Sequence, residues 1–148
     1  MNLGLAEDYA VRALVDLAQH SETRIADIAA RTGIPGPHLA KVVQSLVRAG
    51  LVETSRGRRG GVRLARPAEE IALREVIEAV QGPLRFLRCP RRGIDCPRNP
   101  ECPLLRVWLD LEASISSQLN NVRLADLLIS CGQPCSKAGG QTGLEPTF

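Results

Sequence analysis

Apolar residues near the start of the chain recur at steps of three or four positions, which is the pattern of an amphipathic helix over residues 5–19. Glu7 and Asp8 lie in the first turn of this predicted helix. Acids at that place ordinarily complement the helix dipole, and the pattern alone requires no further role for them. The apolar residues are Ala6, Ala10, Ala13, Leu14, Leu17 and Ala18.

Two further helical patterns follow, with a tight turn between them. Residues 24–31 predict a short second helix, and Gly33 suits a left-handed cap at its end. The chain restarts at Pro35 and Pro37, and a third helical pattern then runs to Gly50. Helix, glycine-containing turn and helix form the helix-turn-helix pattern, which by itself is a weak indication of DNA binding.

Alternation of apolar and polar residues replaces the helical spacing after Gly50. Residues 51–54 and 62–64 predict two strands, and the glycine-rich segment between them predicts a hairpin turn. This glycine-rich segment also carries a row of arginines. Such a row can serve simply as the solvated edge of a strand. Directly after a helix-turn-helix, however, it is better explained as a wing that contacts phosphates or the minor groove.

The residues that we expect to contact DNA fall into two groups. The start of the third helix, where base edges are usually read, carries Pro37, His38 and Lys41. The predicted wing carries Arg56, Arg58, Arg59, Gly60 and Arg63.

Helical spacing returns in residues 70–81 and again in residues 104–120, and a short helix follows in residues 124–130. The longer helix would extend about 25 Å, which is too long to bury its apolar stripe against so small a domain. We therefore expect a second copy of the chain to cover this stripe. The stripe repeats close to the 3.5-residue period of a helix–helix seam, at Leu104, Trp108, Leu111, Ile115, Leu119 and Val122.

These patterns predict a mainly α fold with a small β-hairpin wing, divided into four parts. Residues 1–83 form a winged helix-turn-helix domain, and residues 84–103 form a cysteine-containing loop. Residues 104–130 hold the dimerisation helix and the short C-terminal helix. Residues 131–148 are rich in Gly and Pro, and we expect this tail to be disordered.

Charge and composition restrict the kinds of molecule that the protein can bind. The formal net charge is only +3, but basic residues gather in the wing and in the cysteine loop. Aromatic residues make up 3% of the chain, which leaves no stacking platform for single-stranded nucleic acid and favours duplex DNA. No apolar run approaches the roughly 18 residues of a membrane span. We therefore expect a cytoplasmic protein with no membrane partner and with reduced thiols.

Three cysteines, Cys89, Cys96 and Cys102, lie in the loop, and each is followed by a proline. Arginines crowd the same loop, and cationic neighbours favour the reactive thiolate, which binds soft metals. Inert buried cysteines or a disulfide are alternatives. A loop with almost no apolar neighbours suits inert buried cysteines poorly.

The spacing of these cysteines bears on which metal they hold. Structural zinc favours closely paired cysteines and four ligands, whereas six and five residues separate these three. Wide gaps favour an iron–sulfur cluster. Zinc, or a thiol switch without metal, remains open. A small iron–sulfur redox protein is a less favoured alternative, because nothing outside the loop resembles a substrate site and the wing would have no purpose. We predict that the protein is not an enzyme.

The order of elements resembles the Rrf-two family of bacterial winged-helix regulators, over residues 1 to about 130. The match looks most like the nitric-oxide-sensing NsrR branch, a relative of the IscR and RirA branches. The motifs that carry it are Glu7-Asp8-Tyr9, His38-Leu39-x-Lys41-Val42, Arg48-Ala49-Gly50, Arg56-Gly57-x-x-Gly60-Gly61, Gly61-Val62-Arg63-Leu64 and Leu124-Ala125-Asp126-Leu127.

This resemblance implies a homodimeric repressor whose three cysteines hold an iron–sulfur cluster, with 4Fe-4S favoured and 2Fe-2S as an alternative. Change of the cluster by nitric oxide, redox state or iron supply would alter DNA affinity. The resemblance also picks out Asp8 from the partner subunit as the remaining ligand, with Glu7 as its substitute. Two-fold symmetry would make the operator palindromic.

The chain departs from the family pattern at three places. The gap of six residues between Cys89 and Cys96 differs by about one residue from the commoner family spacing. IscR-type proteins have a histidine ligand three residues after the third cysteine, and Leu105 stands at that place here. The usual Ser-x-x-Tyr opening of the recognition helix reads Pro35-Gly36-Pro37-His38, and the common Glu is Ala40. The resemblance therefore implies no particular operator sequence.

Overall fold

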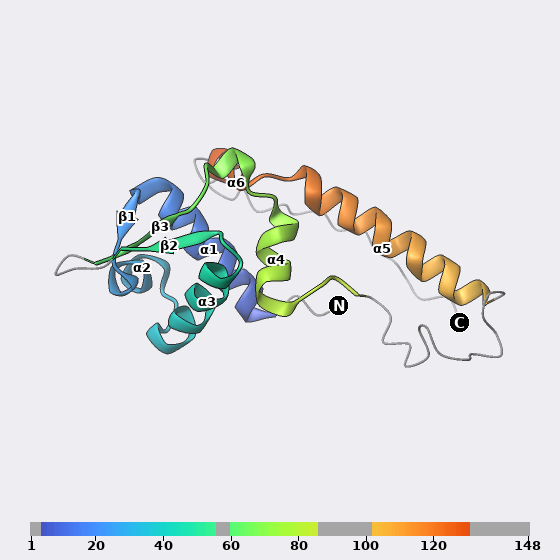
Figure 1. Cartoon of the computed structure of the whole chain (residues 1–148), viewed down its shortest axis with the longest axis horizontal. Coiled ribbons are helices and arrows are strands. Elements are labelled where there is room, and N and C mark those ends of the chain that lie inside the picture. Colours follow the sequence, from blue (N-terminus) through green and yellow to red (C-terminus); the bar gives the residue numbers. More distant parts are fainter. Residues whose placement is uncertain (1–3, 56–59, 86–101, 131–148) are drawn as a thin grey trace, which may run out of the picture.

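A computed structural model describes residues 4–55, 60–85 and 102–130. The described chain is mainly helical with one small antiparallel sheet, which confirms the predicted fold class (Figure 1). The elements, in chain order, are α1 (Leu5–His20), β1 (Glu22–Thr23), α2 (Ile25–Thr32), α3 (Gly36–Arg48), β2 (Val52–Thr54), β3 (Val62–Leu64), the 3-10 turn η1 (Ala68–Glu70), α4 (Leu73–Gln81), α5 (Pro103–Asn121) and α6 (Leu124–Ser130).

Helix α1 is the centre of the body. Its buried apolar residues Ala10, Ala13, Leu14 and Leu17 stand at the spacing that predicted the helix. They belong to one core cluster with buried residues of α2, α3, α4 and α6, and α1 packs against all four of these helices and against β3. The position of α1 therefore governs how the other elements are arranged.

Two acidic side chains of α1, Glu7 and Asp16, are buried in this body. Asp16 of α1 is only 7% exposed, and both of its carboxylate oxygens accept hydrogen bonds of 2.7 Å from Arg31 of α2. Arg31 also donates to Thr23 Oγ1 at 2.9 Å. The hydrogen bond to Asp16 raises the pKa of Arg31 and outweighs partial desolvation. These hydrogen bonds therefore tie α1, α2 and β1 together.

The sheet has three strands in the order β1-β3-β2, one more than the predicted hairpin. The added strand β1 pairs antiparallel with β3, with Thr23 opposite Val62. Gly61 permits this pairing, because a Cβ at that position would lie 2.9 Å from the Thr23 carbonyl oxygen. The base of the wing is thus joined to the end of α1.

The predicted helix over residues 70–81 begins later than expected, at Leu73. Ile71 and Ala72 are instead extended against residues 122–124. The Leu73 N–H donates to Val122 O and the Leu124 N–H donates to Ile71 O, both at 2.9 Å. These two bonds connect the start of α4 to the segment between α5 and α6.

Helix α5 extends away from the body. It joins the body at its C-terminal end, near α6, and its first residues lie at the far end of the molecule (Figure 1). None of its residues is buried, and Leu104, Val107 and Leu111 are 59%, 55% and 43% exposed. We call these three residues the exposed stripe. Of the predicted seam, Trp108, Ile115 and Leu119 are half-buried.

In the described ranges, no helix combines the length and the hydropathy needed to cross a lipid bilayer.

Candidate nucleic-acid interface and metal centre

Helix α3 presents one face to the core and the opposite face to solvent. The buried face holds Leu39, Val42, Val43 and Leu46. Gly33 has φ +71° and ends α2 by donating to Ala29 O at 2.9 Å, which allows the sharp turn into α3. α2 and α3 with this turn form the predicted helix-turn-helix.

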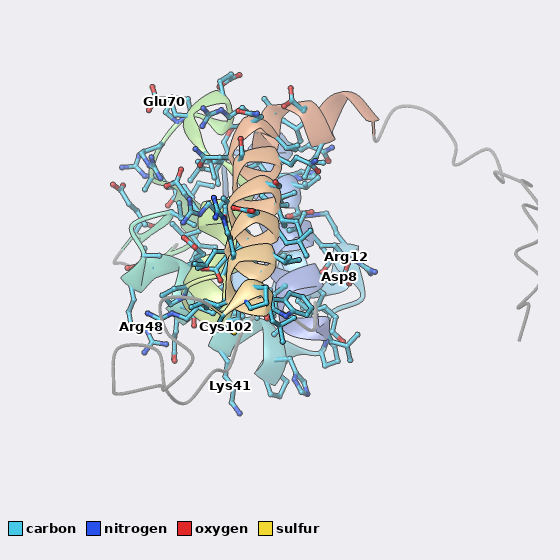
Figure 2. All side chains as sticks on the ribbon, turned by 90° about the vertical axis from the view of Figure 1, so that its right-hand side faces the viewer. Asp8, Arg12, Lys41, Arg48, Glu70 and Cys102 are labelled. Atoms are coloured by element: carbon cyan, nitrogen blue, oxygen red, sulfur yellow. The ribbon has the colours of Figure 1, made fainter. Side chains whose placement is uncertain are left out.

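The residues predicted to read DNA lie on the outer face of α3. Pro37, His38 and Lys41 are all exposed, as helical spacing requires for residues that alternate with the buried ones. Lys41 projects from the lower end of the body in Figure 2, and Arg48 lies near the same end.

Two further polar residues on this outer face were missed in the sequence. Gln44 and Arg48 are exposed, and Arg48 donates to Gln44 O at 3.3 Å and to Ser45 Oγ at 3.2 Å. Gln44 follows Lys41 by three residues and Arg48 follows Gln44 by four, and this helical spacing is the signal that could have identified them. From His38 to Arg48, the exposed residues of α3 are therefore all polar.

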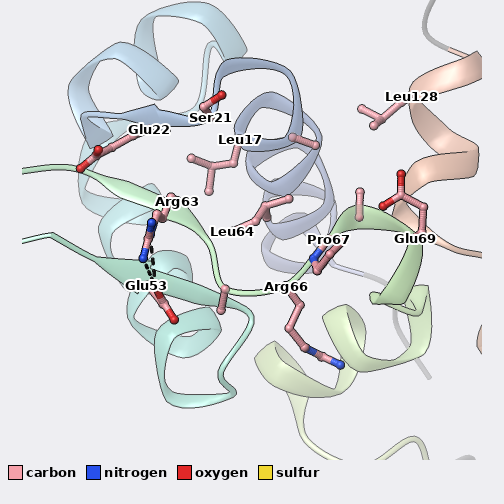
Figure 3. A pocket seen from close by; sticks show the side chains of 13 residues that line it. Leu17, Ser21, Glu22, Glu53, Arg63, Leu64, Arg66, Pro67, Glu69 and Leu128 are labelled. Atoms are coloured by element: carbon pink, nitrogen blue, oxygen red, sulfur yellow. Dashed lines mark hydrogen bonds and ion pairs between the residues drawn. The ribbon is translucent and has the colours of Figure 1, made fainter.

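Arg63 lies in a different environment from the one expected of a free phosphate contact. Its Nε and Nη2 atoms donate to Glu53 Oε2 of β2 at 3.2 and 2.9 Å (Figure 3). On the other side of β3, Arg63 stands opposite Glu22 of β1. Glu22 in turn accepts a hydrogen bond from the Ser55 hydroxyl. The charge of Arg63 is already matched by an acid on the same sheet.

The rest of the predicted wing is described only at its base. Gly60 is half-buried next to β3, while Arg56, Arg58 and Arg59 lie outside the described residues. On the outer side of the sheet, a cavity of about 710 Å³ opens between the strands, the end of α1 and Leu128 of α6. Its charged residues are the acids Glu22, Glu53 and Glu69 and the bases Arg63 and Arg66, so acids outnumber bases in the lining of this cavity.

Only one of the three predicted cysteine ligands is within the described chain. Cys102 is half-buried and stands at the N-cap of α5, and its thiol is not in a disulfide. Cys89 and Cys96 lie outside the described residues. Among the residues that are described, no three His, Cys, Asp or Glu side chains gather closely enough to hold a metal ion.

The two predicted acidic ligands differ sharply in their surroundings. Glu7 is 8% exposed, and its carboxylate accepts the Gly4 N–H at 2.8 Å, which caps the start of α1. Asp8 points outward and makes a 2.9 Å ion pair with Arg12, in which both side chains are about half exposed (Figure 2). Of these two acids, Asp8 is the one accessible from outside.

Asp8 and Cys102 are separated within one chain. Asp8 belongs to the first turns of α1 on the body, whereas Cys102 stands at the far end of α5 (Figure 1). A site that used both residues would therefore need them from two copies of the chain.

Comparisons with known proteins identify relatives over most of the sequence. The model of the Rrf2 family, described as an iron-dependent transcriptional regulator, matches residues 6–129. The HTH-type transcriptional regulator IscR of Vibrio campbellii is 39% identical over 123 residues, which cover 81% of this chain and 73% of that protein.

Solved structures show the same arrangement of elements. IscR of T. potens has a TM-score of 0.70 at 29% identity, over 97% of this chain and 94% of that one. CymR, the global cysteine regulator of B. subtilis, has a TM-score of 0.72 at 22% identity, over 88% and 98% of the two chains. The second likeness concerns the fold alone.

Proposed function

We propose, on the premise that this chain belongs to the Rrf2 family of winged-helix transcription regulators, that it is a homodimeric repressor controlled by an iron–sulfur cluster. Members of this family are DNA-binding proteins and not enzymes. In the proposed function, nitric oxide, redox state or iron supply changes the cluster, and the change alters affinity for a palindromic operator.

The observation that carries the DNA-binding part is the outer face of α3. Its exposed residues are polar or small, and they stand on a helix whose other face is fixed in the core. A helix held in this way can enter the major groove and present His38 and Lys41 to base edges. The arginines at the wing tip would then contact phosphates or the minor groove.

The cysteine set fits an iron–sulfur cluster chemically. Cys102 stands at the N-cap of α5, and thiolates are the usual ligands of cluster iron. Cys89 and Cys96 would supply two more. When bound, the cluster would offer iron and sulfide that nitric oxide and oxidants attack. The family description as an iron-dependent regulator supports the choice of iron over zinc.

Asp8 of the partner subunit is the preferred remaining ligand. It would have to leave only a half-exposed ion pair with Arg12, and such pairs contribute about 0–1 kcal/mol. Glu7 would have to abandon the N–H of Gly4 and move out of a buried position. A carboxylate is a harder and weaker ligand than a thiolate, so that iron would be more open to small molecules.

The dimer would form along α5. The exposed stripe is apolar and confined to the first half of the helix, next to Cys102, whereas exposed residues of the second half, such as Ser117 and Gln118, are polar. If the α5 helices of two copies crossed at the exposed stripe, the stripe would be buried. The N-terminal end of each α5, with Cys102, would then lie near the body of the partner.

Anaerobic purification followed by iron, sulfide and zinc analysis tests the cofactor. We expect iron and sulfide in near-equal amounts, and DNA affinity that falls on titration with nitric oxide. Stoichiometric zinc without sulfide would support a zinc-dependent regulator instead. Metal-free protein whose DNA affinity changes with a thiol oxidant would support a thiol switch.

Substitution of the ligands tests their assignment. Each Cys→Ala change at Cys89, Cys96 and Cys102 should abolish the cluster. Asp8→Ala should keep it but change its absorption spectrum and its rate of reaction with nitric oxide. Glu7→Ala is the matched control, and it should lower thermal stability by removing the α1 cap while leaving the spectrum unchanged. If Asp8→Ala also leaves spectrum and rate unchanged, the remaining ligand is another group, such as water, Cys131 or Cys135.

A further inference from the structure

The chain has a single tyrosine, and its ring contacts a predicted base-reading side chain. Tyr9 of α1 and His38 of α3 have ring centroids 6.3 Å apart with planes at 70°, an edge-to-face arrangement. Tyr9 is half-buried and packs against the core, whereas His38 is exposed in the first turn of α3. The contact joins a half-buried ring to an exposed one.

We propose that Tyr9 is a positioning residue for DNA recognition, which holds the imidazole of His38 in the orientation that reads base edges. This inference rests on the proposed reading of DNA by α3. Tyr9 itself stands on α1 behind the outer face of α3 and acts only through His38.

The physical reason is preorganisation. An exposed histidine samples several rotamers, and fixing them at an interface lowers affinity. Edge-to-face packing on Tyr9 restricts these rotamers before DNA arrives. Tyr9 can do so because its neighbours Ala10 and Ala13 are fully buried in the core, which fixes the path of α1. An arrangement set in advance favours the operator over other sequences, because only there does the imidazole meet its matching base.

A purely structural role for Tyr9 makes a different prediction. If its ring only fills space beside the core, its removal destabilises α3 as a whole and weakens binding to every DNA sequence alike. If it positions His38, its removal weakens binding only where the base under His38 is the preferred one. The pattern of base preference therefore separates the two roles.

The experiment selects bound sequences from a random duplex library with the full-length protein, and then measures affinity for the selected duplex and for single-base variants. The variants are Tyr9→Phe, Tyr9→Leu, His38→Ala and the double change Tyr9→Leu with His38→Ala. Circular dichroism melting establishes that each is folded, and Tyr9→Met replaces Tyr9→Leu if the latter is not.

We expect Tyr9→Phe to keep the full preference, since it keeps the ring. Tyr9→Leu should lose about two- to ten-fold in affinity for the selected duplex. The base pairs at which Tyr9→Leu loses preference should be the same ones that His38→Ala affects. The salt dependence of binding and the affinity for unrelated duplex should not change. The double variant should lose no more than His38→Ala alone.

Two results would overturn the proposal. One is a Tyr9→Leu protein that keeps the original base preference or weakens binding to all duplexes equally. The other is the absence of a nuclear Overhauser contact between the Tyr9 and His38 rings in the unmodified protein, with His20 as the internal reference. A library from which the unmodified protein selects no sequence would instead contradict the proposed function.

Discussion

At the scale of single residues, Glu75 performs two tasks with one carboxylate. One oxygen accepts the Ala72 N–H at 3.2 Å, and the other pairs with Arg66 at 2.5 Å. Burial raises the pKa of Glu75, but the bonds from Arg66 and Ala72 and the positive charges of Arg66 and Arg123 outweigh it. The net pKa therefore lies below its ordinary value.

This shift predicts an acid-dependent loss of stability. Because the folded pKa of Glu75 is lower than the unfolded one, its contribution is complete above the unfolded pKa and is lost as pH falls through the folded pKa. Glu75→Gln should lower the free energy of unfolding at pH 7 by about 1 kcal/mol or less, since the pair is partly exposed.

Urea titrations at a series of pH values measure this difference, which should shrink as the pH falls below the ordinary pKa of a glutamate. Glu69→Gln is the control, because Glu69 is exposed on the neighbouring turn η1. An equal difference between Glu75→Gln and the unmodified protein at every pH would contradict the assignment.

Residue-level detail was the least predictable from sequence. Glu7 and Asp8 are adjacent acids in one helical turn, and nothing in their order reveals that Glu7 folds back onto Gly4 while Asp8 remains accessible. The Asp16–Arg31 pair joins positions fifteen residues apart on two helices. Such contacts depend on how the helices pack, and hydrophobic spacing does not encode that packing.

At the scale of elements, the wing depends on the close approach of β3 to β1. A methyl group at Gly61 would meet the Thr23 carbonyl oxygen at 2.9 Å and Glu22 Cγ at 3.2 Å. Because the first of these atoms is backbone, relief requires the strands to separate.

Gly61→Ala should therefore destabilise the protein by about 1–3 kcal/mol. It should also speed amide exchange in residues 62–64 and weaken DNA binding. Gly36→Ala is the matched control for stability, because no atom lies within 4 Å of its added Cβ. Unchanged exchange in the strands of the Gly61→Ala protein would show that the sheet tolerates the methyl group.

The wing arginines should contribute unequally to DNA affinity. Replacement of both Arg58 and Arg59 by Ala should weaken binding to all sequences and lower the log–log salt slope by roughly 0.9 for each phosphate that is no longer neutralised. Arg63→Ala should change the slope less, because Arg63 is already paired with Glu53. Binding measured from low to moderate salt compares the three proteins, and an unchanged slope in the double variant would remove the wing tip from the interface.

Most elements were predicted well, and the failures have physical causes. Helices α1, α3 and α5 lie within one or two residues of their predicted ranges, because each buries or presents a regular apolar stripe. Strand β1 was missed because Glu22 and Thr23 are only two polar residues, and their pairing is made by β3 and not by their own pattern. The late start of α4 has the same kind of cause, a pairing with residues 122–124.

At the scale of the whole molecule, α5 should determine assembly. Leu111→Asp would place a charge in the proposed seam, which costs several kcal/mol if it remains unpaired there. Sedimentation should then find a monomer. Ser117→Asp is the matched control, since Ser117 is exposed on the polar half of the same helix, and it should remain dimeric. A dimeric Leu111→Asp protein would place the interface elsewhere.

Because α5 extends away from the body, Cys102 lies far from Asp8 of the same chain, and this separation makes the proposed site depend on protein concentration. In the proposed site each copy supplies only part of the ligand set, so a complete site exists only in the associated pair. By mass action, the fraction of complete sites then rises with the number of molecules per cell. The expression level of the gene would therefore set a threshold concentration of the protein. Below this concentration the regulator would not respond to its signal, however strong the signal is.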